Sequence, residues 1–304
     1  MSKTFYPLVT VGVPIFQGEK FLEESLPSIC RQSYPNLEII VIDDNSTDNS
    51  FDLCKKIHNE FKNFKLILNK NNLGAWDNFK KILQKSKGEY FCWACQDDFF
   101  DEKFIEKQVD VFLNNKDIIA TLPSYDLINY EKKIISTISY KNFKLPQNES
   151  KIFAAINLFR SRKINGIREK NNMFIHGLIK KNKIINIVKS YDGIIFSERA
   201  IVFFLALVGR LYFIEERLWK RTYRGPLTDR EDRIKDPYML ERRKLKFPFF
   251  NNIRIMIIIT LNNNSLNIFN KILSLKLIFL ITVKKIFLEI WFSSIGFIRG
   301  RISS

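Results

Sequence analysis

Two stretches decide the fold: Leu37–Asp44, LEIIVIDD, and Tyr90–Asp98, YFCWACQDD. Each is a short run of β-branched or aromatic residues, as in a buried strand, and each ends in two adjacent aspartates. Ligands of parallel α/β sheets bind beyond the carboxyl ends of the strands. The two pairs, Asp43–Asp44 and Asp97–Asp98, therefore mark the sheet edge at which we expect the functional site.

Strands and helices alternate along the first half of the chain. We predict strands at Leu8–Ile15, Leu37–Ile42, Lys65–Leu68, Tyr90–Cys95 and Ile118–Leu122. We predict helices at Glu19–Arg31, from the Ser46–Asp48 cap to about Phe61, at Ala75–Ser86 and at Asp101–Asn114. This alternation requires right-handed crossovers and predicts a mostly parallel α/β sheet flanked by helices.

The charge of the chain is divided unevenly. Of its 304 residues, 49 are Lys or Arg and 32 are Asp or Glu, which gives a formal net charge of +17. Residues 1–120 carry a net charge of −3, whereas residues 121–304 carry +20. Four cysteines are too few for a disulfide scaffold and the N-terminal MSKTFYPLVTVGVP lacks the apolar core of a secretory signal, so we expect a cytoplasmic protein.

Adjacent aspartates at a strand end are costly unless a cation or a hydrogen-bond donor compensates them. Carboxylate oxygens suit Mg²⁺ or Mn²⁺, which typically use one or two protein carboxylates together with substrate phosphates. A pyrophosphate-bearing substrate bridged by such a metal therefore fits Asp97–Asp98. The alternative is that both pairs only cap the helices that follow them. Two pairs on one sheet edge favour the metal site.

Two segments of the chain resemble glycosyltransferase family 2. They are VTVGVPIFQGEKFLEESLPSICRQSYPNLEIIVIDDNSTDNS, residues 9–50, and NNLGAWDNFKKILQKSKGEYFCWACQDDFF, residues 71–100. The resemblance is close across Leu8–Leu113, weaker across Phe174–Arg224 and absent in the tail. It implies a GT-A fold and inverting transfer of a sugar from a nucleotide-diphosphate donor, usually with Mn²⁺ or Mg²⁺. It divides the chain into a nucleotide-sugar-binding half (1–120), an acceptor-binding half of the same catalytic domain (121–225) and a basic, apolar helical extension (226–304).

The resemblance also implies roles for single positions in donor binding. Asp44 matches the residue that hydrogen-bonds a uracil-type base, which favours a UDP-type donor, and Asp43 matches a residue that supports the loop. Gln96 stands where many members have a third acid, a departure that bears on the metal requirement. The other nucleotide-sugar positions are Pro14, Phe16, Asn71, Gly74, Asn78 and Asp97, and the implied metal ligands are Asp98 and Asp97.

An inverting transfer needs one general base that takes the proton from the acceptor hydroxyl. The segment SERAIVFFLALVGRLYFIEERLWKRTYRG, residues 197–225, resembles the one in which the family places this base at a helix start. The resemblance implies Glu198 as the base, with Asp192 as the alternative. Arg221 and Arg224 match a loop that closes over the diphosphate, and guanidinium groups suit phosphate geometry. We expect His176, which lies in an apolar stretch, to be a core histidine rather than an acceptor contact.

The tail becomes rich in Ile, Leu and Phe after a charge-dense stretch. Leu273–Ile298 is long enough to span a bilayer, but lysines interrupt it, and each mid-helix Lys costs roughly 2.5–3.5 kcal/mol on insertion scales. An amphipathic helix on an anionic membrane surface fits better. We therefore expect peripheral attachment to the cytoplasmic membrane face, where lipid-linked acceptors are found. The alternative is a helical cap on the catalytic domain or on a partner chain.

The main interpretation is a glycosyltransferase that acts on a glycan or lipid-linked acceptor in cell-envelope polysaccharide biosynthesis. Three other functions are alternatives to it. The first is a catalytically weak glycosyltransferase-like binding protein. The second is a receiver-like regulatory module, because LEIIVIDD resembles a phospho-acceptor strand, although such a module needs only about 120 residues and leaves the second half without a purpose. The third is nucleic-acid binding, but the basic residues form no recognition motif, so we expect no nucleic-acid partner.

Overall fold

The computed structural model describes residues 6–141, 162–164, 167–169, 173–189 and 198–223, and separate helical positions between 257 and 279. The chain forms two compact units, Met1–Lys246 and Phe247–Ser304. The first unit contains the sheet, both acid pairs and the segments that resemble the family. Its strands are β1 (Val9–Ile15), β2 (Leu37–Asp43), β3 (Phe64–Leu68), β4 (Tyr90–Trp93), β5 (Phe99–Phe100), β6 (Ile118–Ile128), β7 (Ile134–Ile138), β8 (Arg162–Ile164), β9 (Ile167–Glu169), β10 (Ile179–Lys180) and β11 (Arg210–Thr222).

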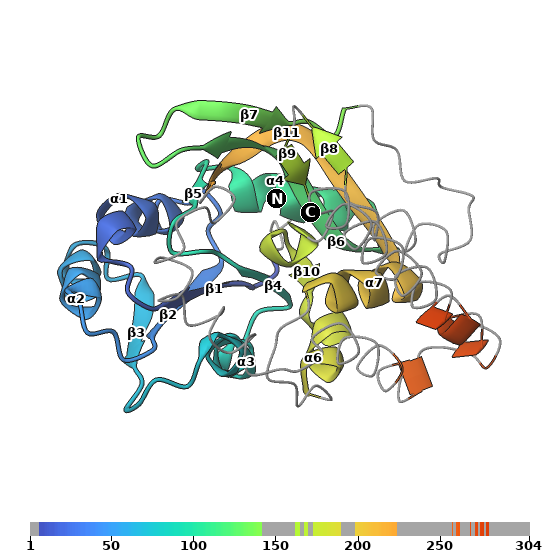
Figure 1. Ribbon diagram of the computed structural model, residues 1–304, viewed down its shortest axis with the longest axis horizontal. Helices are drawn as coiled ribbons and strands as arrows, with labels where there is room; N and C mark the ends of the chain where they lie inside the picture. The colour runs from blue at the N-terminus through green and yellow to red at the C-terminus, as the bar shows by residue number, and fades with distance from the viewer. Residues whose placement is uncertain are drawn as a thin grey trace, which may run out of the picture. The chain divides into compact units, whose positions relative to one another are not determined.

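A nine-stranded sheet crosses this unit in the order β3-β2-β1-β4-β10-β6-β11-β5, with β7 paired to β6 (Figure 1). Strands β3, β2, β1 and β4 run parallel, as the strand–helix alternation predicts. Nearly all side chains of β1 and β4 are buried, which matches their unbroken apolar sequences. Strands β8 and β9 pair with each other as a separate antiparallel hairpin.

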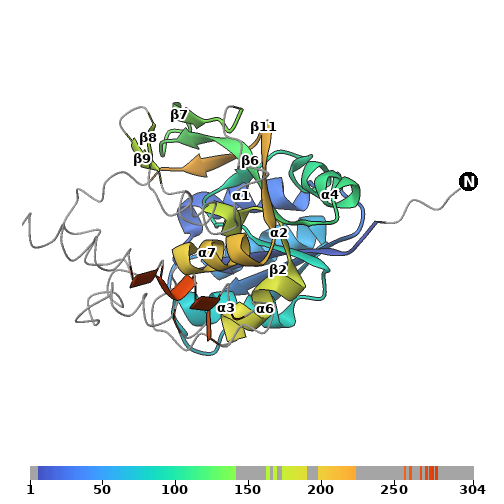
Figure 2. The ribbon, with the colours of Figure 1, turned by 90° about the vertical axis from the view of Figure 1, so that its right-hand side faces the viewer.

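The helices are α1 (Glu19–Cys30), α2 (Ser50–Phe61), α3 (Ala75–Lys85), α4 (Phe104–Asn114), α6 (Lys181–Lys189), α7 (Glu198–Val208) and a 3₁₀ turn, η1 (Met173–His176). Helix α1 contacts α2, while α3, α6 and α7 lie in a row (Figures 1 and 2). Helix α3 buries Trp76, Ile82 and Leu83. Gly12 on β1 lets α3 approach the sheet closely, because a Cβ there would lie 2.2 Å from Ile82 Cγ2.

Two features of the sheet differ from the prediction. Strand β6 continues to Ile128, six residues beyond the expected end at Leu122, because it is buried throughout and pairs along its length with β11. The polar residues in its second half hide this continuation in the sequence. Strand β10 is antiparallel to both β4 and β6, and its two residues are too short a run to show a strand periodicity.

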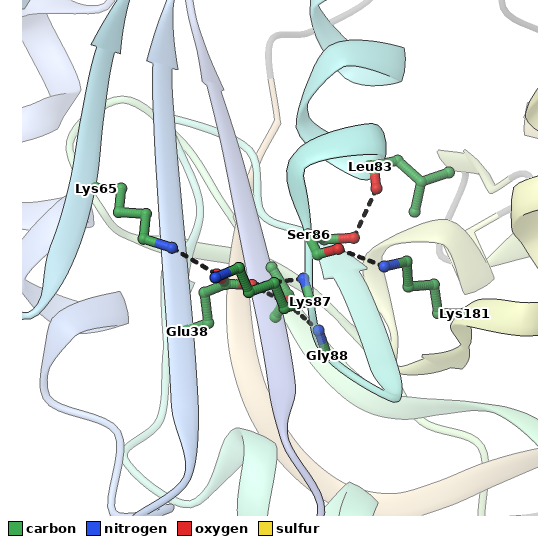
Figure 3. A network of polar contacts seen from close by, with 8 residues as sticks. Glu38, Lys65, Leu83, Ser86, Lys87, Gly88 and Lys181 are labelled. Atoms are coloured by element: carbon green, nitrogen blue, oxygen red, sulfur yellow. Dashed lines mark hydrogen bonds and ion pairs between the residues drawn. The ribbon is translucent and has the colours of Figure 1, made fainter.

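A polar network joins the elements at the opposite end of the parallel strands from the acid pairs (Figure 3). The Glu38 carboxylate of β2 accepts hydrogen bonds from Thr10 Oγ1 at 2.7 Å, Lys65 Nζ at 2.9 Å and the Lys87 backbone N–H at 2.8 Å. Lys181 Nζ donates to the Ser86 carbonyl. The network therefore ties three parallel strands and the end of α3 to the start of α6.

Candidate active site

The two acid pairs lie at the carboxyl ends of β2 and β4, on either side of β1. Asp43 is the last residue of β2, and Asp97–Asp98 follow β4 after three intervening residues. Strand β1 is hydrogen-bonded to both β2 and β4 and ends between them at Ile15. All four carboxyl groups belong to residues that are no more than 5% exposed. The fold thus gathers at one sheet edge the acids that the sequence analysis singled out.

Asp44 holds the loop that leads into α3. Its Oδ1 accepts hydrogen bonds from Asn69 Nδ2 at 2.6 Å and the Leu73 N–H at 2.9 Å, and its Oδ2 accepts one from the Gly74 N–H at 3.0 Å. Gly74 has φ 83°, a left-handed conformation that favours glycine and that aims its N–H at the carboxylate. Two carboxylate oxygens offer about four acceptor positions, and these three hydrogen bonds from described residues use three of them.

The asparagines near Asp44 divide into buried and exposed positions. Asn78 is buried and donates to the Ile42 carbonyl at 3.1 Å, whereas Asn71, which the resemblance assigns to the nucleotide, is exposed on the loop. Asn69, which sequence reasoning missed, donates to Asp44 and accepts a hydrogen bond from Lys81 Nζ at 2.6 Å. A buried polar residue directly after a strand was the available signal, but the run of four polar residues after Leu68 concealed which one turns inward.

Asp43 stabilises its own loop. Its Oδ1 accepts the Ser46 N–H at 2.8 Å, and its Oδ2 accepts no hydrogen bond from the residues that the structure describes. Burial raises the pKa of Asp43, and the neighbouring Asp48 and Asp44 add to the rise. These contacts agree with the supporting role expected of Asp43.

The second acid pair is held by the end of β11. Thr222 Oγ1 donates to the Asp97 carbonyl, and the Thr222 N–H donates to Asp98 Oδ1 at 3.3 Å. Arg221 precedes Thr222 on the same strand, and its positive charge acts on the buried ring of His176, on which the Asp97 carboxylate acts in the opposite sense. The structure thus places the charges of Arg221 and Asp97 near one histidine, and it adds Thr222 to the site, a residue that no sequence motif indicated.

The structure describes only some of the other predicted site residues. Pro14 lies in β1 opposite Ile42, and Phe16 follows the end of β1, partly exposed. Glu198 is the first residue of α7, the helix start that the resemblance implied, but its side chain lies outside the described residues. Asp192 and Arg224 also lie outside them.

His176, the last residue of η1, is buried beside the end of β4. Its Nδ1 lies 3.1 Å from the Trp93 carbonyl oxygen and 3.7 Å from Cys95 Sγ. Because a carbonyl only accepts, Nδ1 carries the proton and the neutral ring donates to Trp93. Burial lowers the pKa of His176 to about 4, with a further contribution from the positive charge of Arg221. These contacts fit the expected core histidine.

The family model described as "Glycosyl transferase family 2" matches residues 10–180. The chain belongs to glycosyltransferase family 2. Family membership argues against the receiver-like alternative. A receiver-like module needs only about 120 residues, whereas the sheet of this chain includes strands as far along the sequence as β11.

Relatives of this family 2 chain include two uncharacterized glycosyltransferases of Haemophilus influenzae. One is 39% identical over 127 residues, 42% of this chain and 39% of that protein, and the other is 32% identical over 134 residues, 43% of this chain and 53% of that protein. The chain therefore matches about half or less of the length of these relatives. Glycosyltransferase GlyG of Streptococcus pneumoniae is 27% identical over 215 residues, 70% of this chain and 69% of GlyG.

Solved structures share the GT-A fold. S. aureus TarS 1-349 in complex with UDP-GlcNAc has a TM-score of 0.59 at 16% identity and covers 88% of this chain and 70% of its own. The mannosyltransferase PcManGT from Pyrobaculum calidifontis, in complex with GDP-Man and Mn²⁺, has a TM-score of 0.50 at 15% identity and covers 84% of this chain and 73% of its own. At these identities the likeness establishes the fold.

Proposed function

We propose that this chain transfers a sugar from a nucleotide-diphosphate donor, with inversion, to a hydroxyl of a glycan or lipid-linked acceptor. The observation that carries the proposal is the meeting of both acid pairs at one sheet edge, where Thr222, the residue after Arg221, binds Asp97 and Asp98. That edge offers Asp44 as a hydrogen-bond acceptor for the nucleotide base and Asp97 and Asp98 as ligands for a cation. Arg221, on the strand that ends there, offers a guanidinium for the diphosphate. The nucleotide-sugar complexes of TarS and PcManGT support this assignment.

Asp44 favours a UDP-type donor. Its carboxylate only accepts hydrogen bonds, and three donors from the chain already occupy it. A ligand can supply a fourth donor, and the imide N–H of uracil or thymine is such a group, whereas the ring nitrogen of cytosine at the same place is an acceptor. Guanine also carries a ring N–H, so the test must include GDP.

Asp98 and Asp97 fit a divalent cation. They supply hard oxygen donors, and the described residues hold no cluster of three or more acidic, histidine or cysteine groups that could form a complete cage. Mg²⁺ and Mn²⁺ typically complete their coordination with substrate phosphates and water. Such an ion, held by Asp98 with Asp97, would supply neutralisation of the charge that develops on the departing diphosphate.

The remaining chemistry belongs to side chains of the second half of the fold. We assign the general base to Glu198, since one displacement by the acceptor hydroxyl gives inversion and requires one proton acceptor. Arg221, on the strand whose end binds Asp97 and Asp98, stabilises negative charge on the diphosphate. Both roles need no covalent intermediate on the chain.

The donor is tested by a thermal-shift screen of the whole chain with UDP, GDP, dTDP and CMP, each with and without Mn²⁺. We expect the largest rise in Tm with UDP or dTDP and Mn²⁺, and a loss of the Mn²⁺-dependent part in Asp98→Ala. A comparison variant, Asp101→Ala, removes a nearby exposed acid outside both pairs. If none of the four nucleotides raises Tm, the proposed function is wrong.

The general base is tested by Glu198→Gln. This variant should bind the donor nucleotide with unchanged affinity and lose about 10²–10⁴-fold in transfer, the usual contribution of a positioned base. Transfer is measured with radiolabelled donor and an extract of lipid-linked glycans, and Asp192→Asn serves as the matched variant. Near-normal turnover of Glu198→Gln with a loss in Asp192→Asn would move the role to Asp192.

We further propose peripheral attachment to the cytoplasmic membrane face through the second unit. No helix in the described part of the chain is both long enough and apolar enough to cross a bilayer. Ile268, Ile272 and Phe279 lie at helical positions and are at least half exposed. The nearby Lys271 and Lys276 match an anionic lipid surface.

A further inference from the structure

The Gln96 side chain joins the second acid pair to the end of β1. Its Oε1 accepts the Phe16 N–H at 2.9 Å, and its Nε2 donates to the Phe16 carbonyl at 3.0 Å. The amide therefore closes a two-bond ring with the backbone N–H and carbonyl of one residue, as a neighbouring strand would. On its other side, Ser25 Oγ donates to the Gln96 carbonyl at 2.6 Å, which anchors the Gln96 backbone on α1.

The turn at residues 16–18 is also held by the loop after Asp43–Asp44 and by the start of α2. The Gln17 N–H donates to Ser46 Oγ at 3.0 Å, and the Gly18 N–H donates to Ser50 Oγ at 2.7 Å. Gln17 has φ 50°, so the turn is fixed in a left-handed conformation. The turn 16–18 is thus fastened to β2–α2 by two serines and to the Asp97–Asp98 loop by Gln96.

Only an amide satisfies the contacts at position 96. A carboxylate accepts the Phe16 N–H but cannot donate to the Phe16 carbonyl, which would then face a negative oxygen. Gly18 leaves room for the amide, because a Cβ at that position would lie 2.8 Å from Gln96 Oε1. Gln96 therefore uses both polar atoms of its side-chain amide to build the turn.

We propose that Gln96 is a positioning residue that sets the distance between the part of the site for the nucleotide base and the part for the diphosphate. This rests on the proposed function, in which the base lies by Phe16 and Asp44 and the diphosphate by Asp97 and Asp98. A UDP-type ligand gains affinity when both parts are held at the spacing that one molecule spans. Loss of the amide separates the two parts while leaving each of them intact.

The test measures the affinities of UDP, uridine and pyrophosphate, all with Mn²⁺, for the whole chain and for Gln96→Glu and Gln96→Met. We expect UDP affinity to fall at least tenfold, and by more than the product of the losses for uridine and pyrophosphate. The matched control is Gln32→Glu, because Gln32 also accepts a backbone N–H, from Ile105 at 3.1 Å, and donates to a backbone carbonyl, of Asp101 at 2.8 Å. This control should leave all three affinities within twofold.

Three affinity results would overturn the proposal. They are UDP affinity within twofold of the unchanged chain, equal losses for all three ligands, or the same loss in Gln32→Glu. Hydrogen exchange of the nucleotide-free chain gives a separate measurement: Gln96→Met should speed exchange at Phe16–Gly18 and in the Asp97–Asp98 loop at least tenfold. If no ligand binds the unchanged chain, the proposed function fails. If hydrogen exchange in Gln96→Met equals that of the unchanged chain, the positioning role of Gln96 fails, whatever the outcome for the proposed function.

Discussion

The carboxylate of Asp44 serves both the loop before α3 and, in the proposed function, the nucleotide base. Asp44→Asn replaces one oxygen with an NH₂ group that cannot accept from the N–H of Leu73 or Gly74. We expect a loss of about 1–3 kcal/mol in the free energy of unfolding and at least a tenfold loss in UDP affinity. Urea denaturation and titration calorimetry measure these, with Asp77→Asn on exposed α3 surface as control. Unchanged UDP affinity would remove Asp44 from the base site.

His176 should make the stability of the chain depend on pH. Its pKa is about 4 in the folded protein against an ordinary value of 6.5, so the unfolded chain takes up a proton first as the pH falls. The stabilisation is complete above pH 6.5 and declines between 6.5 and about 4, by up to about 3 kcal/mol.

Urea denaturation of His176→Gln across this pH range tests the origin of the slope. The His176→Gln variant should lose the change in the free energy of unfolding with pH that His176 causes. The His58→Gln variant retains His176 and should keep that change. An unchanged slope in His176→Gln would show that other groups produce it.

At the scale of the elements, the Glu38 network joins β1, β2 and β3 to the end of α3 (Figure 3). Burial alone would raise the pKa of Glu38, but the hydrogen bonds from Lys65, Lys87 and Thr10 outweigh it and lower the pKa. The stabilisation from Glu38 is therefore present at neutral pH and is lost as the pH falls through the lowered folded pKa.

Glu38→Gln should reduce the free energy of unfolding by about 2 kcal/mol, because Thr10, Lys65 and Lys87 lose a charged acceptor that is only 10% exposed. UDP affinity should stay unchanged, since the network lies at the end of the strands opposite the acid pairs. Glu23→Gln is the control, because its ion pair with Lys56 spans 3.8 Å between exposed side chains and contributes little. Equal stability of the two variants would contradict the role of the network.

At the scale of the whole molecule, the basic second unit should direct the chain to anionic membranes. The whole chain should pellet with vesicles that contain phosphatidylserine at low salt and be released at high salt, because surface charges are screened. Ile272→Asp should weaken pelleting severalfold through the loss of an apolar contact with lipid, whereas Leu113→Asp, an exposed apolar site on α4, should not. Pelleting that ignores both salt and Ile272→Asp would contradict membrane attachment.

The sequence predicted the parallel strands and helices of the first half because each strand there is a short apolar run with a helix after it. It also placed both acid pairs at strand ends. It missed β10 and the second half of β6, since two residues show no periodicity and the polar residues of β6 are buried in part by the distant strand β11. Local patterns report burial against near neighbours, and these strands are buried by segments about 60 to 90 residues away.

For the site, the sequence alone determined which acids exist and at which strand ends they stand, because strand direction fixes the edge to which their side chains belong. The tertiary structure alone decided how those acids are held. Thr222 reaches Asp97 and Asp98 because β11 pairs with β5, which directly follows the acid pair, and Gln96 reaches Phe16 because β4 lies beside β1. Such contacts depend on the register between distant strands, and no local stretch of sequence encodes that register.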